Sequence, residues 1–298
     1  MRLYNITSIT LATLAASLFF NQRPLLGDDA ESFLLRYKFQ ADQVIRYEVS
    51  LHDDYVVKIG ELTEEPHSYQ DSIKNYRVLS VNEDGSAIIE LMMESAKLDL
   101  FQNGAKAKFD SQFDKKPQLI FKPIASMIGR PHLKLTISPT GEVSDLKPLL
   151  NQKDEPNQLA IDVLVQLPEE PVKVGGIWKE DIAVPLSLPG SPLKQMVKLQ
   201  RRYFVRSVEN GIATITIKTK VLTPLNDPEL EMQLLRRKPE GSMQIDLKRG
   251  LLLSRTLTQK NQVVNFGKGA TQMDFKQLHT EKLLPTQIAA KSGESVNR

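Results

Sequence analysis

The sequence predicts a mainly β fold with a few short helices, arranged as two tandem antiparallel curved-sheet repeats of half-barrel type. Residues 76–95 and 203–222 each begin with a tyrosine, break at a Gly turn and resume with an apolar residue at every second position. A period of two around a Gly turn is typical of a β-hairpin. A second strand–Gly turn–strand unit follows each hairpin, over Gly141 and Gly250, so the same plan occurs twice in the same order.

The first repeat is predicted to span residues 31–150. We expect a hairpin over 33–50 with its turn at 41–43, then a solvated acidic loop over 51–70 that includes a strand at 55–59. The hairpin 76–95 continues to Phe101. Prolines before Ile124 and a glycine after Ile128 predict a short helix over 123–128. Strands resume at 133–137 and return through Val143.

Residues 151–171 are predicted to be a helical linker with its helix over 156–166, because Leu159, Val163 and Leu167 recur at helical spacing before Pro168. The second repeat is predicted over 172–284. It has strands to Pro185, a long extended piece over 196–208, the hairpin over residue 211 and a short helix after 227–228. The polar tail 285–298 is predicted to be disordered.

Residues 1–30 are predicted to be an export signal. Arg2 precedes an uncharged, mostly apolar run over 6–20, and a polar break follows at 21–23. This run is shorter than the roughly 20 apolar residues that a spanning helix needs, so cleavage is favoured over a stable membrane span. The sequence allows cleavage near residues 15–16 or within 27–30 and does not decide between them. The protein is therefore expected to be exported, to the periplasm or the exterior.

Composition excludes several partners and chemistries. The chain has no cysteine, so thiol nucleophiles and thiolate metal sites are absent. Its 39 basic and 36 acidic residues give a net charge of +3 without a dense basic block, which makes nucleic acid a poor partner. The clusters at 201–202 and 236–238 are each interpreted as a solvated strand edge or helix end.

No catalytic, metal or cofactor site is predicted. The four histidines, His52, His67, His132 and His279, lack metal-ligand spacing, and the first two are interpreted as members of the solvated acidic loop. No Gly-x-Ser-x-Gly motif is present. The sequence therefore favours a non-enzymatic protein.

The candidate ligand-binding residues are apolar. They comprise the first short helix, which either plugs the core or covers an apolar cavity, a tryptophan that either packs in the core or faces a ligand, and the second short helix. These residues are Ile120, Ile124, Met127, Ile128, Trp178, Leu230 and Leu234.

Several of the turn motifs carry a resemblance. The tyrosine-led hairpin, the stretches 109–111 and 128–131, the turn 138–143 and the opening 174–178 resemble an exported bacterial family of planctomycete type that has no assigned function. The resemblance covers most of the chain after the signal and implies no activity. At the level of fold alone, the plan is similar to the half-barrel lipoprotein carriers of the bacterial envelope, whose lipid-bearing cysteine is absent here.

Three hypotheses about function follow. The leading one is an exported, non-enzymatic β-rich binding protein that holds an apolar small molecule or an envelope protein. The alternative is a structural or protein-interaction module with solid cores and no ligand. The third, a hydrolase, requires polar groups that converge in a cleft.

Overall fold

A computed structural model describes residues 31–150, 164–187, 190, 193–267 and 269–285. The predicted signal at 1–30, most of the predicted helix at 156–166 and residues 286–298 of the predicted tail lie outside these residues. The strands and helices of the described part are β1 (Ser32–Phe33), β2 (Val44–Ile59), β3 (Leu62–Glu64), β4 (His67–Val81), β5 (Ala87–Gln102), β6 (Ala105–Asp110), η1 (Leu119–Phe121), α1 (Lys122–Met127), β7 (Pro131–Ile137), β8 (Val143–Pro148), β9 (Val172–Lys173), β10 (Ile177–Ser187), β11 (Lys194–Glu209), β12 (Ile212–Val221), α3 (Pro228–Gln233), β13 (Glu240–Asp246), β14 (Leu251–Val264) and β15 (Thr271–Leu283).

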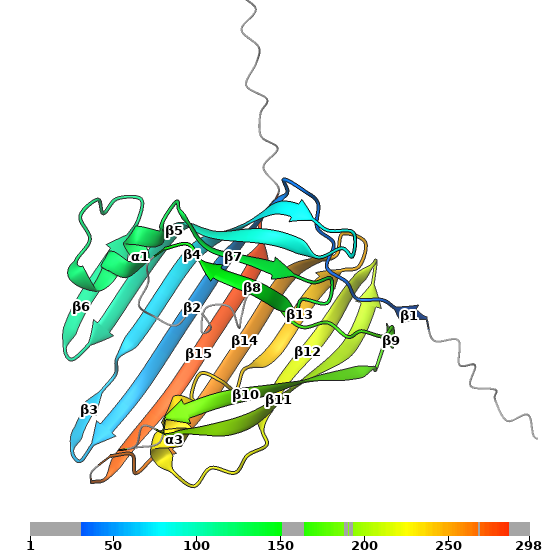
Figure 1. Cartoon of the computed structure of the whole chain (residues 1–298). Coiled ribbons are helices and arrows are strands. Elements are labelled where there is room, and N and C mark those ends of the chain that lie inside the picture. Colours follow the sequence, from blue (N-terminus) through cyan, green and yellow to red (C-terminus); the bar gives the residue numbers. More distant parts are fainter. Residues whose placement is uncertain (1–30, 151–163, 188–189, 191–192, 268, 286–298) are drawn as a thin grey trace, which may run out of the picture. The chain divides into compact units, whose positions relative to one another are not determined.

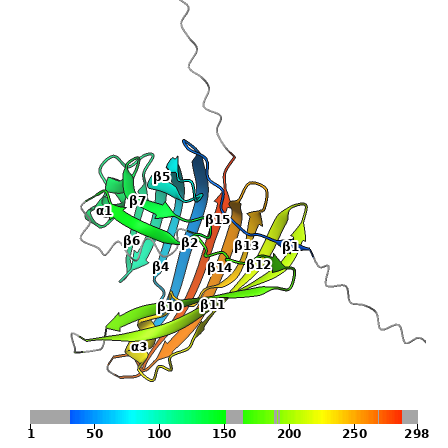
Figure 2. The same ribbon diagram turned by 45° about the vertical axis from the view of Figure 1, so that its right-hand side comes forward.

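One antiparallel sheet of thirteen strands holds all of the described strands except β1 and β9. Its order is β10-β11-β12-β13-β14-β15-β2-β4-β5-β7-β8, with β3 beside β2 and β6 beside β5. The last strand, β15, pairs with the long N-terminal strand β2 and so joins the two halves. Figures 1 and 2 show that both ends of the sheet, at β7–β8 and at β10–β11, curl to the same side. We call this side the inner face. The predicted mainly β, half-barrel-like fold is confirmed.

The two halves repeat the same plan at the level of individual residues. Tyr76 pairs with Leu91 on β5, and Tyr203 pairs with Ile217 on β12. In both hairpins the register then shifts by one residue, after Val78 in the first and after Val205 in the second. All the apolar positions that predicted these hairpins are buried. Each half also places a short helix between its second and third repeated strands, as the sequence predicted.

The main core joins the two halves at the end of the sheet where the Gly turns lie. It contains apolar side chains from β2, β4, β5 and β7 together with others from β11 to β14. Residues 34–40 cross this core as an extended strap. The Tyr37 amide donates to the carbonyl of Pro139 at 2.8 Å and the Lys38 amide donates to that of Gly250 at 3.1 Å. The strap therefore hydrogen-bonds the equivalent turns of both halves.

The strap and β2 correct two predictions. The hairpin expected over 33–50 is absent, because residues 34–43 lie outside the strands and bond to turns far away in sequence. The strand expected at 55–59 is part of β2, but the acidic loop expected around it is wrong. It is mostly strand, since β2 runs unbroken to Ile59 and β4 begins at His67. Its charged residues lie on both faces of the sheet: His52 forms an ion pair with Asp71 on the outer face, and Asp53 is buried on the inner face.

Residues 164–168 add a further correction. They follow the gap at 151–163, and they form no helix although the predicted helix extended to residue 166. Val165 and Leu167 are buried in the main core, and the Tyr37 hydroxyl donates to the carbonyl of Val165 at 3.0 Å. This segment is fixed by contacts with the strap, which sequence periodicity cannot predict.

Candidate functional site

The seven predicted ligand-binding residues lie in three separate places. In the first half, Met127 is buried, Ile124 and Ile128 are half-buried and Ile120 is exposed. Trp178 stacks on Tyr203 with ring centroids 4.9 Å apart and packs against the main core. Leu230 of α3 and Leu234, at its end, are buried in a small apolar cluster with residues of β10 and β11. The structure does not bring these seven residues together.

A different set of side chains forms a polar belt across the inner face. Successive inward positions of β14, β15 and β2 carry Gln259, Gln277 and Asp53, which are neighbours in the strand registers. Gln277 donates to the carboxylate of Asp53 at 2.7 Å, and Gln259 donates to the amide oxygen of Gln277 at 2.6 Å. Apolar clusters flank this belt on both sides. Along the length of the strands, the inner face therefore changes from apolar to polar and back to apolar.

The belt holds the segment that follows α3. Arg236 forms an ion pair with Asp53 at 2.7 Å and donates to the Tyr55 hydroxyl at 2.5 Å. The backbone amide of Lys238 donates to the side chain of Gln259 at 2.9 Å. Burial raises the pKa of Tyr55 although the nearby guanidinium opposes this, and burial lowers the pKa of Lys238. These contacts fix the direction of the chain at residues 236–238.

The helix itself is set by local sequence. Asp227 caps α3 by accepting a hydrogen bond from the amide of Glu229 at 2.8 Å, and Pro228 occupies the first turn. Because α3 ends after only six residues, the basic cluster 236–238 falls on the inner face of the sheet. The interpretation of the two basic clusters as solvated is therefore wrong for Lys238, which is half-buried, and for Arg201 on β11, whose side chain is only 12% exposed. Arg236 is exposed but ion-paired.

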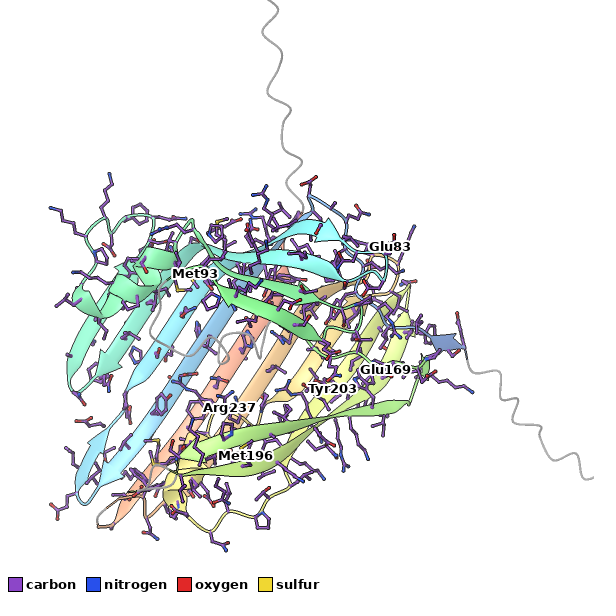
Figure 3. All side chains as sticks on the ribbon, in the orientation of Figure 1. Glu83, Met93, Glu169, Met196, Tyr203 and Arg237 are labelled. Atoms are coloured by element: carbon purple, nitrogen blue, oxygen red, sulfur yellow. The ribbon has the colours of Figure 1, made fainter. Side chains whose placement is uncertain are left out.

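A pocket of about 440 Å³ opens between α3, the β10–β11 hairpin and the belt. Its apolar wall comes mainly from β10 and includes Ile182 and Val184, with Leu199 from β11. Its polar lining includes Arg237, Lys194, Arg201 and His279. Figure 3 shows Arg237 between the hairpin and the long strands.

The cations of this pocket differ in how they are neutralised. Arg236 is paired with Asp53, and Arg201 lies 3.5 Å from Glu180. Among the described residues, no side-chain hydrogen bond or ion pair engages Arg237 or Lys194. The pocket therefore has an excess of positive charge beside an aliphatic wall. This arrangement suits a ligand with an apolar body and an anionic group.

Sequence reasoning missed the belt although a signal was present. The inward positions of residues 257–263 are Leu, Gln, Asn and Val, so two polar residues lie between two apolar ones. The inward positions of residues 273–281 are Met, Phe, Gln, His and Glu. Polar residues at inward positions between apolar ones mark a place where the core is interrupted. Within the described part of the chain, no group of three or more histidine and acidic side chains is placed to hold a metal ion.

Comparisons with known proteins show distant likeness of structure only. No family model matches the chain, and no curated protein matches its sequence. A structure of lipovitellin, described for its lipid–protein interactions, is 9% identical over 87% of this chain at a TM-score of 0.43, and the match spans 27% of that protein. The secretin of the Salmonella type III secretion injectisome, in its open gate state, is 11% identical over 85% of this chain and 63% of its own, at a TM-score of 0.19.

An outer membrane channel from Pseudomonas putida F1 is 8% identical over 83% of this chain and 97% of its own, at a TM-score of 0.21. At TM-scores below 0.5, none of these likenesses supports an inference about function. Within the described residues, none of the helices is long and apolar enough to cross a membrane.

Proposed function

We propose that this protein is an exported, non-enzymatic binding protein of the cell envelope that holds an amphipathic anion in the pocket beside α3. The observation that carries the proposal is the pairing of an aliphatic wall, from Ile182 to Pro185 and Leu199, with the cationic side chains of Arg237 and Lys194. The volume of about 440 Å³ lies in the range of small-molecule sites, roughly 300–1,000 Å³. Export is inferred from the signal-like residues 1–30.

The proposal narrows the class of ligand beyond a purely apolar molecule. A purely apolar ligand would bury the half-buried Arg237 further without a counter-charge, and burying a charge without a partner is costly. A carboxylate or phosphate group satisfies both Arg237 and Lys194 through charge-assisted hydrogen bonds. The alkyl part then lies against β10 and β11.

The alternative, a protein-interaction module, is supported by the two strands that end the sheet. Only one side of β8 and of β10 is paired in the described sheet, and most side chains of β8 are exposed. Unpaired strand edges are templates for adding a strand from another protein. The same experiment separates this alternative from the leading proposal.

Isothermal titration calorimetry tests the proposal. Decyl phosphate, kept below its critical micelle concentration, is titrated into the chain that begins at Glu31. Decyltrimethylammonium is the cationic comparison. We expect one molecule of decyl phosphate to bind per chain, and Arg237→Glu to weaken binding at least tenfold. Lys218→Glu, an exposed residue on the outer face of β12, is the matched charge change and leaves binding unaltered.

Native mass spectrometry of the same protein from cells tests the proposal independently. A co-purifying anionic amphiphile that is lost in Arg237→Glu supports the binding protein. If the purified chain carries no ligand and binds neither amphiphile, the binding proposal is overturned and the interaction module is favoured.

A further inference from the structure

Three large apolar side chains are exposed in one short loop at the edge of the first half. In the segment between β6 and the end of η1, the side chains of Phe113, Leu119 and Ile120 are 75%, 78% and 59% exposed. Figure 1 shows this segment and α1 at the left-hand side of the sheet, beside β6. We call residues 111–122 the docking loop.

The loop is anchored at both ends. At its start, the amides of Phe113 and Asp114 donate to the carbonyl of Asp110 at 3.0 and 2.8 Å. At its end, Phe121 is buried and stacks on Phe109 with ring centroids 5.6 Å apart. The exposed apolar residues therefore sit on a loop whose neighbouring aromatic residue is fixed in the core. Their exposure follows from the fold of the loop.

The docking loop is also basic. It contains Lys115, Lys116 and Lys122 and a single acidic residue, Asp114, which gives a formal charge of +2 from three positive charges and one negative. The whole chain carries +3. All three lysines are exposed, and no ion pair engages them among the described residues. Positive charge is thus concentrated where apolar side chains are exposed.

This composition distinguishes between two kinds of partner. Protein–protein interfaces are enriched in aromatic residues but depleted in lysine. Lysines interleaved with Phe, Leu and Ile are typical of segments that lie in the interface of a membrane, where apolar groups enter the acyl boundary and lysines meet anionic headgroups. The combination of three apolar and three basic side chains therefore fits a lipid surface better than a protein.

We propose that the docking loop binds the surface of a bilayer that contains anionic lipids. Phe113, Leu119 and Ile120 enter the headgroup region, and the three lysines contact the lipid phosphates. The strands keep their hydrogen bonds, because the loop lies outside β6 and β7. This inference does not depend on the pocket beside α3, which lies in the other half of the sheet.

Vesicle flotation tests the proposal with the chain that begins at Glu31, which holds every described element. We expect binding to phosphatidylcholine vesicles with 30 mol% phosphatidylglycerol, and at least tenfold weaker binding to phosphatidylcholine alone or in high salt. The variant Phe113→Ser/Leu119→Ser/Ile120→Ser, and separately Lys115→Glu/Lys116→Glu, should each weaken binding at least tenfold.

The matched control replaces three other exposed apolar residues. Ile177→Ser/Leu193→Ser/Met196→Ser changes side chains that are 61%, 66% and 55% exposed in the second half, and it should bind vesicles as the parent chain does. Circular dichroism verifies that each variant is folded. A docking-loop variant that floats with vesicles as the parent does overturns the proposal, as does a parent chain that never floats. Arg237→Glu should float normally, which separates this result from the ligand proposal.

Discussion

The inserts between equivalent strands have diverged although the strands that flank them have not. Residues 222–239, between β12 and β13, turn inward: α3 has a side-chain cap and buries Leu230 and Leu234, and Arg236 reaches Asp53 across the inner face. Residues 103–130, between β5 and β7, instead expose apolar side chains: α1 lacks a side-chain cap and the loop before it exposes Leu119. The repeated hairpins thus serve as a scaffold, and the inserts account for the differences in surface chemistry between the halves.

The largest expected effect concerns the ion pairs of the two halves. Arg255 and Glu281 are both buried, 2.7 Å apart, whereas Arg46 and Glu94 are about one-fifth exposed. Removing one partner of a buried pair costs about 3–5 kcal/mol, so Glu281→Ala should lower the free energy of unfolding by that amount. Glu94→Ala should cost about 1 kcal/mol.

Urea unfolding measures both losses. The double variant Arg255→Met/Glu281→Leu, which removes both charges, should recover most of the stability that Glu281→Ala loses. Equal losses for Glu281→Ala and Glu94→Ala would contradict the difference in burial on which the prediction depends.

The next effect concerns the strap that joins both halves. A Cβ on Gly250 would lie 2.6 Å from the amide nitrogen of Lys38, and one on Gly141 would lie 2.9 Å from the Tyr37 ring. Both glycines have positive φ. Alanine at either position should cost about 2–4 kcal/mol, through left-handed backbone strain and overpacking together.

Gly211 is the control, because it also has positive φ but a Cβ there meets nothing within 4 Å. Gly211→Ala should cost only about 1 kcal/mol, from backbone strain alone. Thermal unfolding of the three variants measures the order. If Gly211→Ala is as damaging as the other two, the strap does not hold the turns.

The smallest effect is the pH dependence of the first half's ion pair. Burial raises the pKa of Glu94, but hydrogen bonds from Arg46 and Asn75 outweigh it and leave the pKa below its ordinary value of 4.5. A lowered folded-state pKa adds stability that is fully present above about pH 4.5 and is lost as the pH falls through the folded value. Glu94→Gln should therefore be about 1 kcal/mol less stable than the parent at pH 7.

Unfolding curves at pH 7 and at pH 3 test this. The difference between parent and variant should shrink at the lower pH. A difference of the same size at both pH values would mean that the carboxylate of Glu94 contributes no stability through its charge.

The sequence predicted the elements that depend on local pattern. Alternation at Ala87, Ile89 and Leu91 predicted the first hairpin, and Asp227 with Pro228 predicted α3, because turns and caps depend on adjacent residues. Strand alternation failed at residues 34–40, since Leu35 and Tyr37 are buried by turns more than 100 residues away.

The candidate site was predicted least well. Trp178 and Leu234 were chosen because they are apolar, but a site beside the belt depends on Gln259, Gln277 and Asp53 meeting across three strands. Asp53 and Gln277 are 224 residues apart, so their hydrogen bond follows from sheet topology alone. No local pattern contains that information.

The pairing of β15 with β2 has a consequence for the order of folding. Within the thirteen-stranded sheet, every strand from β4 to β14 has its partners among strands close by in the chain, but β2 has one open side until residues 271–283 have been synthesised. Contacts between chain ends have the highest closure entropy and form late. Until then, the longest edge of the first half is a template for aggregation. Folding of this protein therefore reaches completion only when β15 has closed the gap beside β2, so the protection of that edge depends on the last strand of the sheet.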